Sequence, residues 1–169
     1  MNPDRNIVLT GFMGTGKSTV GKLVAQKLGR PFADTDEEIV RQAKQTIPEI
    51  FAQKGEATFR QMERRVCRFL AAQRGYVIAT GGGMLVDEGN REVMFASGVV
   101  ICLQASPEVI RQRVQADNTE RPLLKGDWQV LLEKRRTAYE TIPYQIDTSD
   151  LTPEQIAEKV IQLWQTVST

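Results

Sequence analysis

The stretch Gly11-Phe12-Met13-Gly14-Thr15-Gly16-Lys17-Ser18 decides the fold of this chain. It fits the pattern GxxxxGK[ST], in which glycines let the backbone curl so that successive N–H groups point at a phosphate. An apolar run from Asn6 to Thr10 precedes it and a pattern of helical period follows it, which is the context that the motif requires. A glycine-rich turn that binds nothing would not need this combination. The stretch therefore predicts a phosphate-binding loop.

The loop carries the groups that hold a nucleotide. Lys17 can reach the β- and γ-phosphate oxygens of ATP, and the Ser18 hydroxyl can bind Mg²⁺. We therefore assign ATP binding to Gly14, Thr15, Gly16, Lys17, Ser18 and Thr19. The motif does not identify the phosphate acceptor, because GTPases, ATPases and small-molecule kinases share it. A GTPase is not expected, since the chain has no Asn-Lys-x-Asp segment for guanine.

Outward from the loop, short β-rich runs alternate with longer segments of helical period, which is typical of an α/β fold with a parallel sheet. The predicted strands are Asn6–Thr10, Pro31–Thr35, Tyr76–Thr80, Val99–Leu103 and Tyr144–Asp147. The predicted helices are Lys17–Leu28, Glu56–Gln73, Asn90–Ala96, Pro107–Gln115, Trp128–Glu140 and Pro153–Thr166. Ser106 and Thr152, each followed by proline, are predicted to cap the helices that they precede.

Composition restricts the class of protein. The 169 residues suffice for one core, and no repeat or Ser/Gly linker marks a domain boundary. Because 22 Lys and Arg residues balance 21 Asp and Glu residues, bulk charge does not indicate a nucleic-acid partner. Cys67 and Cys102 lie in apolar runs, and no histidine is present to complete a zinc site. With neither an apolar leader nor a run of the roughly 20 residues that a membrane span needs, we expect a cytoplasmic protein without a membrane partner.

Asp34-Thr35-Asp36 falls at the end of the second predicted strand, at the sheet edge where α/β proteins bind ligands. Because side chains alternate along a strand, both aspartates would point the same way. Asp34 would lie near the metal, and Asp36 could accept a hydrogen bond from a substrate hydroxyl and take its proton. The alternative is a helix cap, since Asp36-Glu37-Glu38 resembles an acidic first turn. Beside a phosphate loop, the functional interpretation is favoured.

Two further patterns keep both a structural and a functional interpretation. Arg60 and Glu63 are spaced to pair on one helix face, either as a solvated contact or as a positioned guanidinium that grips a carboxylate. Gly81-Gly82-Gly83 follows the third predicted strand. The triplet is either a flexible turn or a backbone that must approach a ligand closely.

The polar segment from Ala116 to Asp127 separates two predicted helices and is either a solvated connection or a mobile lid. In a lid, Arg121 would neutralise charge on the transferred phosphoryl group while closure excluded water. Arg135 and Arg136 lie on the following helix, where a basic face is more often solvated than functional.

Taken in order, these motifs resemble those of the shikimate kinase family. The resemblance covers roughly Asn6 to Asp147 and rests on the phosphate loop, Asp-x-Asp, Gly-Glu-x-x-Phe-Arg-x-x-Glu from Gly55, the glycine triplet and Arg121-Pro122-Leu123-Leu124. It implies a three-layer P-loop kinase fold like that of nucleoside monophosphate kinases, with a five-stranded parallel sheet flanked by helices. The implied domain is single, 1–169, with a mobile lid at about 114–126.

The resemblance also implies a reaction and its residues. The γ-phosphate of ATP would pass to the 3-hydroxyl of shikimate, a step of aromatic amino acid biosynthesis. The implied shikimate-binding residues are Asp36, Arg60, Gly81, Gly82 and Arg135, and the implied catalytic residues are Asp36 as base, Lys17 and the lid residue Arg121. Mg²⁺ would lie at Ser18 and, through water, Asp34, and Arg113 would pack on adenine. ATP and shikimate would be the only partners of a monomer.

The chain departs from the family pattern at two places. The family's second carboxylate-binding arginine lies in Arg-x-Pro-Leu-Tyr, and this chain has Arg135-Arg136-Thr137-Ala138-Tyr139. Spacing from the tyrosine selects Arg135, and Arg136 is its rival. Lys44 stands where the family places a glycine, which puts the local turn in question. A gluconate or nucleoside monophosphate kinase and a non-catalytic nucleotide-binding module are the alternative functions.

Overall fold

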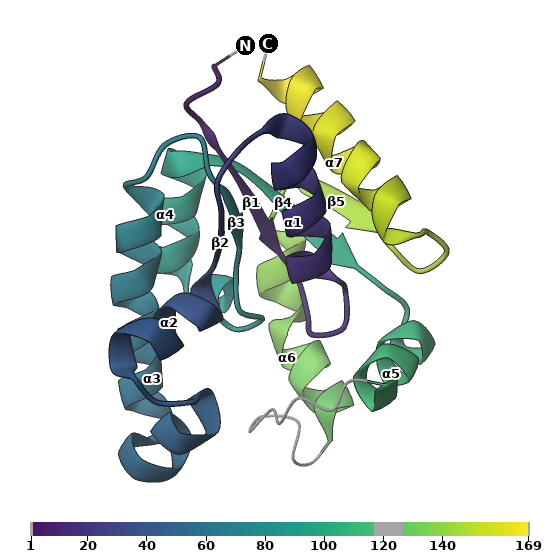
Figure 1. The fold of residues 1–169 in the computed structure, drawn as a ribbon. Coiled ribbons are helices and arrows are strands. Elements are labelled where there is room, and N and C mark those ends of the chain that lie inside the picture. The colour runs from purple at the N-terminus through teal and green to yellow at the C-terminus, as the bar shows by residue number, and fades with distance from the viewer. Residues whose placement is uncertain (1, 117–126, 169) are drawn as a thin grey trace.

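The computed structural model describes residues 2–116 and 127–168, and Figure 1 shows a sheet with helices on both faces. The described strands are all parallel and lie in the order β2-β3-β1-β4-β5. Their bounds are β1 Asn6–Thr10, β2 Phe32–Asp34, β3 Val77–Ala79, β4 Gly98–Gln104 and β5 Tyr144–Asp147. The predicted five-stranded parallel sheet is confirmed.

The helices flank this sheet in chain order. Their bounds are α1 Lys17–Leu28, α2 Thr35–Ala43, α3 Ile47–Ala71, α4 Glu88–Ser97, α5 Pro107–Ala116, α6 Trp128–Glu140 and α7 Pro153–Val167, with a 3₁₀ helix, η1, at Met84–Val86. Helices α1 and α6 have the predicted bounds, and α4, α5 and α7 differ from prediction by one or two residues. The sequence did not predict α2 or the first part of α3.

Alternate side chains of β1 face two separate cores, because this strand lies in the middle of the sheet with all its residues buried. Val8 packs among buried residues of α2, α3, α4, α5 and α6 on one face. Ile7 and Leu9 pack among buried residues of α1 and α7 on the other face. The predicted three layers are thus confirmed. Cys67 and Cys102 are free thiols buried in the first core, as predicted.

Strand β2 ends earlier than predicted because Asp34 caps helix α2. Its Oδ1 atom accepts hydrogen bonds from the N–H groups of Asp36 (2.9 Å) and Glu37 (3.2 Å). Asp36 therefore lies in the first turn of a helix, and the prediction that strand alternation sets its direction is wrong. The helix cap and the acidic first turn, which were the alternative interpretation, are present.

Helix α3 contains a kink that sequence periodicity did not reveal. Gly55 has φ 82° and ψ 169°, a conformation that is essentially restricted to glycine. The predicted helix, Glu56–Gln73, corresponds to the part after the kink. The part before it starts at a capping box between Thr46 and Glu49. Because the chain bends at Gly55, the Phe51 ring before the kink packs on the Phe59 ring after it, with centroids 4.9 Å apart.

Strand register brings three loops to one edge of the sheet. Leu9 pairs with Ala79, and Ala79 pairs with Asp34, so these residues form one row across β1, β3 and β2. The phosphate loop, the glycine triplet and the start of α2 all begin within two residues of this row. Figure 1 shows both chain termini at the opposite end of the strands. The carboxyl edge therefore collects the motifs that the sequence singled out.

Two sequence predictions bear on parts of the chain around this edge. Of the predicted lid, 114–116 end helix α5, whereas 117–126, with Arg121, lie outside the described residues. Within the ranges that are described, no helix combines the length and apolar character needed to cross a membrane.

Candidate active site

The phosphate loop joins β1 to α1 in the conformation that its glycines permit. Gly16 has φ 88° and precedes the first residue of α1, so the positive end of this helix opens onto the loop. The Nζ atom of Lys17 donates hydrogen bonds to the carbonyl oxygens of Gly11 (2.6 Å) and Phe12 (3.0 Å). The Thr15 hydroxyl donates to the Phe12 carbonyl at 2.8 Å. The loop thus presents an ammonium group and a helix N-terminus to the same space.

Ser18 and Asp34 join the loop to the end of β2. The Ser18 hydroxyl donates to Oδ2 of Asp34 at 2.5 Å, while Oδ1 of Asp34 caps α2. The described residues contain no group of three or more His, Cys, Asp or Glu that could hold a metal by themselves. One hydroxyl beside one carboxylate fits Mg²⁺, which takes few protein ligands and keeps water and substrate phosphate oxygens in its shell.

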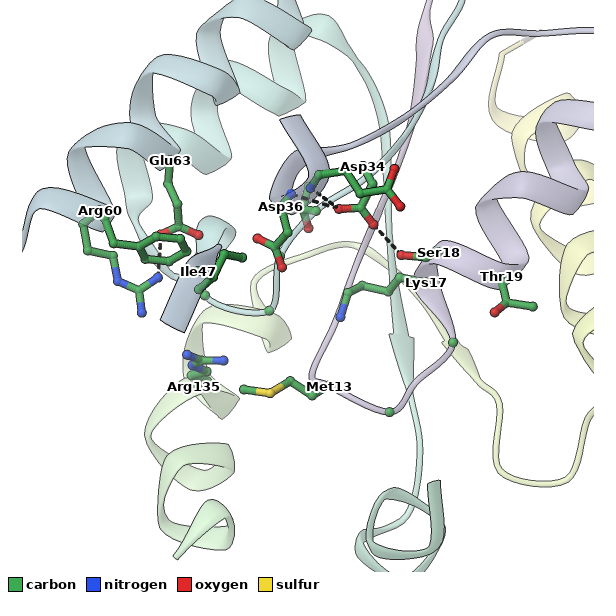
Figure 2. Close-up of a pocket in the computed structure, with 18 of the residues that line it drawn as sticks. Met13, Lys17, Ser18, Thr19, Asp34, Asp36, Ile47, Arg60, Glu63 and Arg135 are labelled. Atoms are coloured by element: carbon green, nitrogen blue, oxygen red, sulfur yellow. Dashed lines mark hydrogen bonds and ion pairs between the residues drawn. The ribbon is translucent and has the colours of Figure 1, made fainter. Parts of the chain in front are cut away.

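A pocket of about 600 Å³ opens at this edge, and Figure 2 shows ten of its residues by name. The sequence-predicted residues that line it are Gly14, Gly16, Lys17, Ser18, Thr19, Asp34, Asp36, Arg60, Gly81, Gly82, Arg113 and Arg135. Thr15 instead lines a smaller adjoining hollow, and Arg121 lies outside the described residues. The structure thus brings together residues from six elements or loops that are far apart in the sequence.

Arg60 and Glu63 form a buried pair on the wall of this pocket. Nη1 of Arg60 donates to Oε1 of Glu63 at 2.5 Å, and the Glu63 side chain is 2% exposed. Burial raises the pKa of the Glu63 carboxyl to about 7, although the Arg60 guanidinium opposes this shift. Of the two interpretations of this pair, the solvated contact is wrong. The guanidinium is positioned at the pocket.

The arginine on α6 that enters the pocket is Arg135. Its side chain is 4% exposed, and no acceptor among the described residues receives a hydrogen bond from its Nη1 atom. Arg136 has a side chain 62% exposed and pairs with Glu133 and Glu140 on the outer face of the helix. The spacing from Tyr139 therefore selected the arginine that lies in the pocket.

The glycine triplet forms one floor of the pocket and is fixed by its neighbours. The Gly81 N–H donates to the buried Thr35 hydroxyl at 2.7 Å. The Tyr139 hydroxyl donates to the Gly82 carbonyl, and burial raises the pKa of Tyr139 to about 12, so it keeps the proton that it donates. These bonds exclude the flexible turn that was one interpretation of the triplet.

Sequence reasoning did not assign several residues that line the pocket: Met13, Glu37, Ile47, Phe51, Phe59, Glu63, Thr80 and Gly83. The Arg60 spacing could have identified Glu63. Phe51 and Phe59 give the pocket an apolar wall, but the sequence places them eight residues apart on what looks like two unrelated segments. Only the kink at Gly55 brings their rings together.

Arg113 lies between the pocket and the smaller hollow of about 250 Å³. Its Nη1 atom donates to the Gly14 carbonyl (3.1 Å) and its Nη2 atom to the Thr148 carbonyl (3.0 Å), which hold the guanidinium beside the phosphate loop. Leu151, Pro153 and Ile156 line the hollow next to it. An apolar surface beside a fixed guanidinium can accept a flat aromatic group.

Comparison with known proteins gives a consistent result. A family model described as shikimate kinase matches residues 13–165. A protein named shikimate kinase from Thermodesulfovibrio yellowstonii is 44% identical, over 97% of this chain and 97% of its own length. The solved shikimate kinase from Acinetobacter baumannii, in complex with shikimate, has a TM-score of 0.91 at 38% identity and covers 96% of this chain and 94% of its own. A gluconokinase from Sinorhizobium meliloti 1021, 18% identical with a TM-score of 0.57, covers 99% of this chain and 98% of its own and shares the fold alone.

Proposed function

Because the chain belongs to the shikimate kinase family and is an ATP-dependent kinase that phosphorylates shikimate, we propose that the pocket of Figure 2 is its active site. One observation carries this assignment: the same pocket is lined by the phosphate loop, by two guanidinium groups and by Asp36, which lies between Lys17 and Arg60 in Figure 2. Family membership favours shikimate over gluconate or a nucleoside monophosphate as acceptor, and a kinase over a non-catalytic module.

The two arginines would bind the carboxylate of shikimate. Arg60 is held by the buried Glu63, and Arg135 is a buried cation whose Nη1 atom has no acceptor among the described residues. A buried charge without a partner is costly, and a carboxylate that accepts hydrogen bonds from both guanidinium groups would offset that cost. The apolar wall of Phe51 and Phe59 would then face the carbon ring of the substrate.

Asp36 would act as the base. Both carboxylate oxygens of Asp34 already accept hydrogen bonds, from Ser18 and from the N–H groups that it caps. Asp36 would take the proton of the 3-hydroxyl as this oxygen forms a bond to the γ-phosphorus and the bond to the bridging oxygen of ADP breaks. Lys17 would exchange its bonds to loop carbonyls for bonds to the phosphates. The protein's contribution is mainly alignment and neutralisation of charge.

The remaining nucleotide contacts extend this assignment. Mg²⁺, when bound, would neutralise phosphate charge, and the Ser18 hydroxyl and, through water, Asp34 would hold it. The hollow beside Arg113 would accept adenine. For Arg121 the support is the family resemblance, which makes it the lid arginine that stabilises the transferred phosphoryl group. A single domain, 1–169, acting as a cytoplasmic monomer is consistent with the need for ATP and with two buried free thiols.

A matched pair of neighbouring arginines tests the assignment. Arg135→Ala should raise the KM for shikimate roughly 10- to 100-fold, because a hydrogen bond to a charged group contributes about 1.5–3 kcal/mol. Its KM for ATP should change less than about threefold, since its contacts are with the acid and not the nucleotide. Arg136→Ala, on the outer face of the same helix, is the control and should leave both constants unchanged. An ADP-release assay measures all of them, and the opposite ranking of the two variants would contradict the assignment.

A further inference from the structure

The three glycines after β3 lie against three different charged side chains. A Cβ atom added at Gly81 would lie 2.5 Å from Oδ1 of Asp36, and one added at Gly82 would lie 3.1 Å from Nη1 of Arg135. One added at Gly83 would lie 2.5 Å from Nη1 of Arg60 and 3.1 Å from Nη2 of Arg135. Separations below 3.0 Å essentially do not occur, so a methyl group at Gly81 or Gly83 requires a neighbour to move.

Backbone conformation does not explain these glycines. Gly83 has φ −93° and ψ −10°, and neither Gly81 nor Gly82 has a positive φ, so an alanine could adopt the same conformation at each position. A role as backbone N–H donor does not explain them either, because alanine keeps that group. What glycine supplies here is the absence of a side chain.

The triplet cannot easily yield to an added methyl group, because its backbone is tied on both sides. Thr35 and Tyr139 bind Gly81 and Gly82, and the N–H groups of Met84 and Val86 donate to the Gly81 (3.1 Å) and Gly83 (3.3 Å) carbonyls as η1 begins. Met84 is fully buried. The contacted atoms of Asp36 and Arg60, by contrast, are the ends of flexible side chains. The charged groups would therefore move.

We propose that Gly83 is a positioning residue for substrate recognition, because its missing side chain lets the guanidinium groups of Arg60 and Arg135 lie against one backbone segment at a fixed spacing. Gly81 has the corresponding role for the carboxylate of Asp36. The inference rests on the proposed function, in which the two arginines bind the shikimate carboxylate. It separates the triplet into one glycine that serves binding and one that serves the transfer step.

Single substitutions should therefore affect different kinetic constants. Gly83→Ala should raise the KM for shikimate about tenfold or more, with kcat and the KM for ATP within about threefold of wild type, because only the acid-binding cations are displaced. Gly81→Ala should instead lower kcat about tenfold or more, because the base is displaced. Gly89→Ala is the control: Gly89 is exposed in the first turn of α4, and an added Cβ would contact only Asp87. Identical effects of Gly81→Ala and Gly83→Ala on both constants would overturn the inference.

A double-mutant cycle distinguishes displacement of Arg60 from a direct clash between the new methyl group and shikimate. If Gly83 acts through Arg60, adding Gly83→Ala to Arg60→Ala should raise the KM for shikimate by less than about threefold further. A full additional tenfold effect would overturn the inference alone. An unchanged KM in Arg60→Ala itself would overturn the assignment of Arg60 to the substrate, and the inference with it. The thermal midpoint and the KM for ATP of each variant verify that it is folded.

Discussion

At the scale of single residues, the pocket is a set of charges held partly out of water. Glu63 is buried behind Arg60, and Asp36 and Arg135 both act on its ionisation. Burial of an acid raises its pKa, and the neighbouring guanidinium groups reduce that shift but do not cancel it. The group that fixes the substrate-binding arginine is therefore also one that can change its charge near neutral pH.

This ionisation predicts how stability depends on pH. Because burial raises the pKa of Glu63 from 4.5 to about 7, the folded protein keeps a proton that the unfolded chain loses between these values. The free energy of unfolding should fall as pH rises through this range, by roughly 3 kcal/mol at most. Glu63→Gln has no such group, so its thermal midpoint should fall less than that of the ligand-free wild type between pH 5 and pH 7.5, by roughly 5–10 °C. A wild-type midpoint that rises relative to the variant over this range would contradict the burial of Glu63.

The residues that could be predicted from sequence were those whose chemistry is specific to few tasks. Lys17 and Asp36 stand next to recognisable motifs, and the structure brings both to the pocket. Phe51 and Gly83 could not be predicted, because apolar residues and glycines occur throughout any chain. Their place in the pocket depends on which side chain packs against them in three dimensions, and no local pattern encodes that contact.

At the scale of elements, the region between β2 and the second half of α3 was the least predictable. Helix α2 has nine residues, too few for a clear period, and its cap was obscured because Asp34 also suited a metal site. The capping box at Thr46 could have revealed the start of α3. The turn between the two helices contains Lys44, which has φ 54° and is the only described residue other than glycine with positive φ. Its N–H caps α2 by donating to the Val40 carbonyl at 2.9 Å.

Lys44→Gly should therefore stabilise the protein. A left-handed conformation costs a non-glycine residue about 1–2 kcal/mol, and glycine recovers part of this while adding unfolded-state entropy. We expect a net gain of about 0.5–1 kcal/mol, or roughly 1–4 °C in the thermal midpoint.

The matched control is Lys159→Gly, which replaces an exposed lysine inside helix α7 and should cost about 1 kcal/mol. Thermal or urea denaturation of the two variants gives the comparison. If Lys44→Gly destabilised the protein as much as Lys159→Gly does, the strain at this turn would be refuted.

At the scale of the whole molecule, strand order makes the site. The sequence predicted five parallel strands, but the order β2-β3-β1-β4-β5 depends on contacts between residues distant in sequence and was not predicted. This order makes β3 the neighbour of both β1 and β2, so the phosphate loop, Asp36 and the glycine triplet lie side by side. Lys17, Asp36 and Arg60 consequently line one pocket, which is the arrangement that the motifs required and that no single motif could guarantee.

The most direct test of this account is the turnover number of Asp36→Asn at saturating ATP and shikimate, measured by ADP release. Loss of a general base typically lowers turnover about 10²- to 10⁴-fold, and we predict a loss of this size. The KM for ATP should stay within about threefold of wild type, because Lys17 and the phosphate loop are unchanged. Near-normal turnover in a folded Asp36→Asn variant would show that the substrate hydroxyl does not meet the nucleotide at this carboxylate, and would contradict the account.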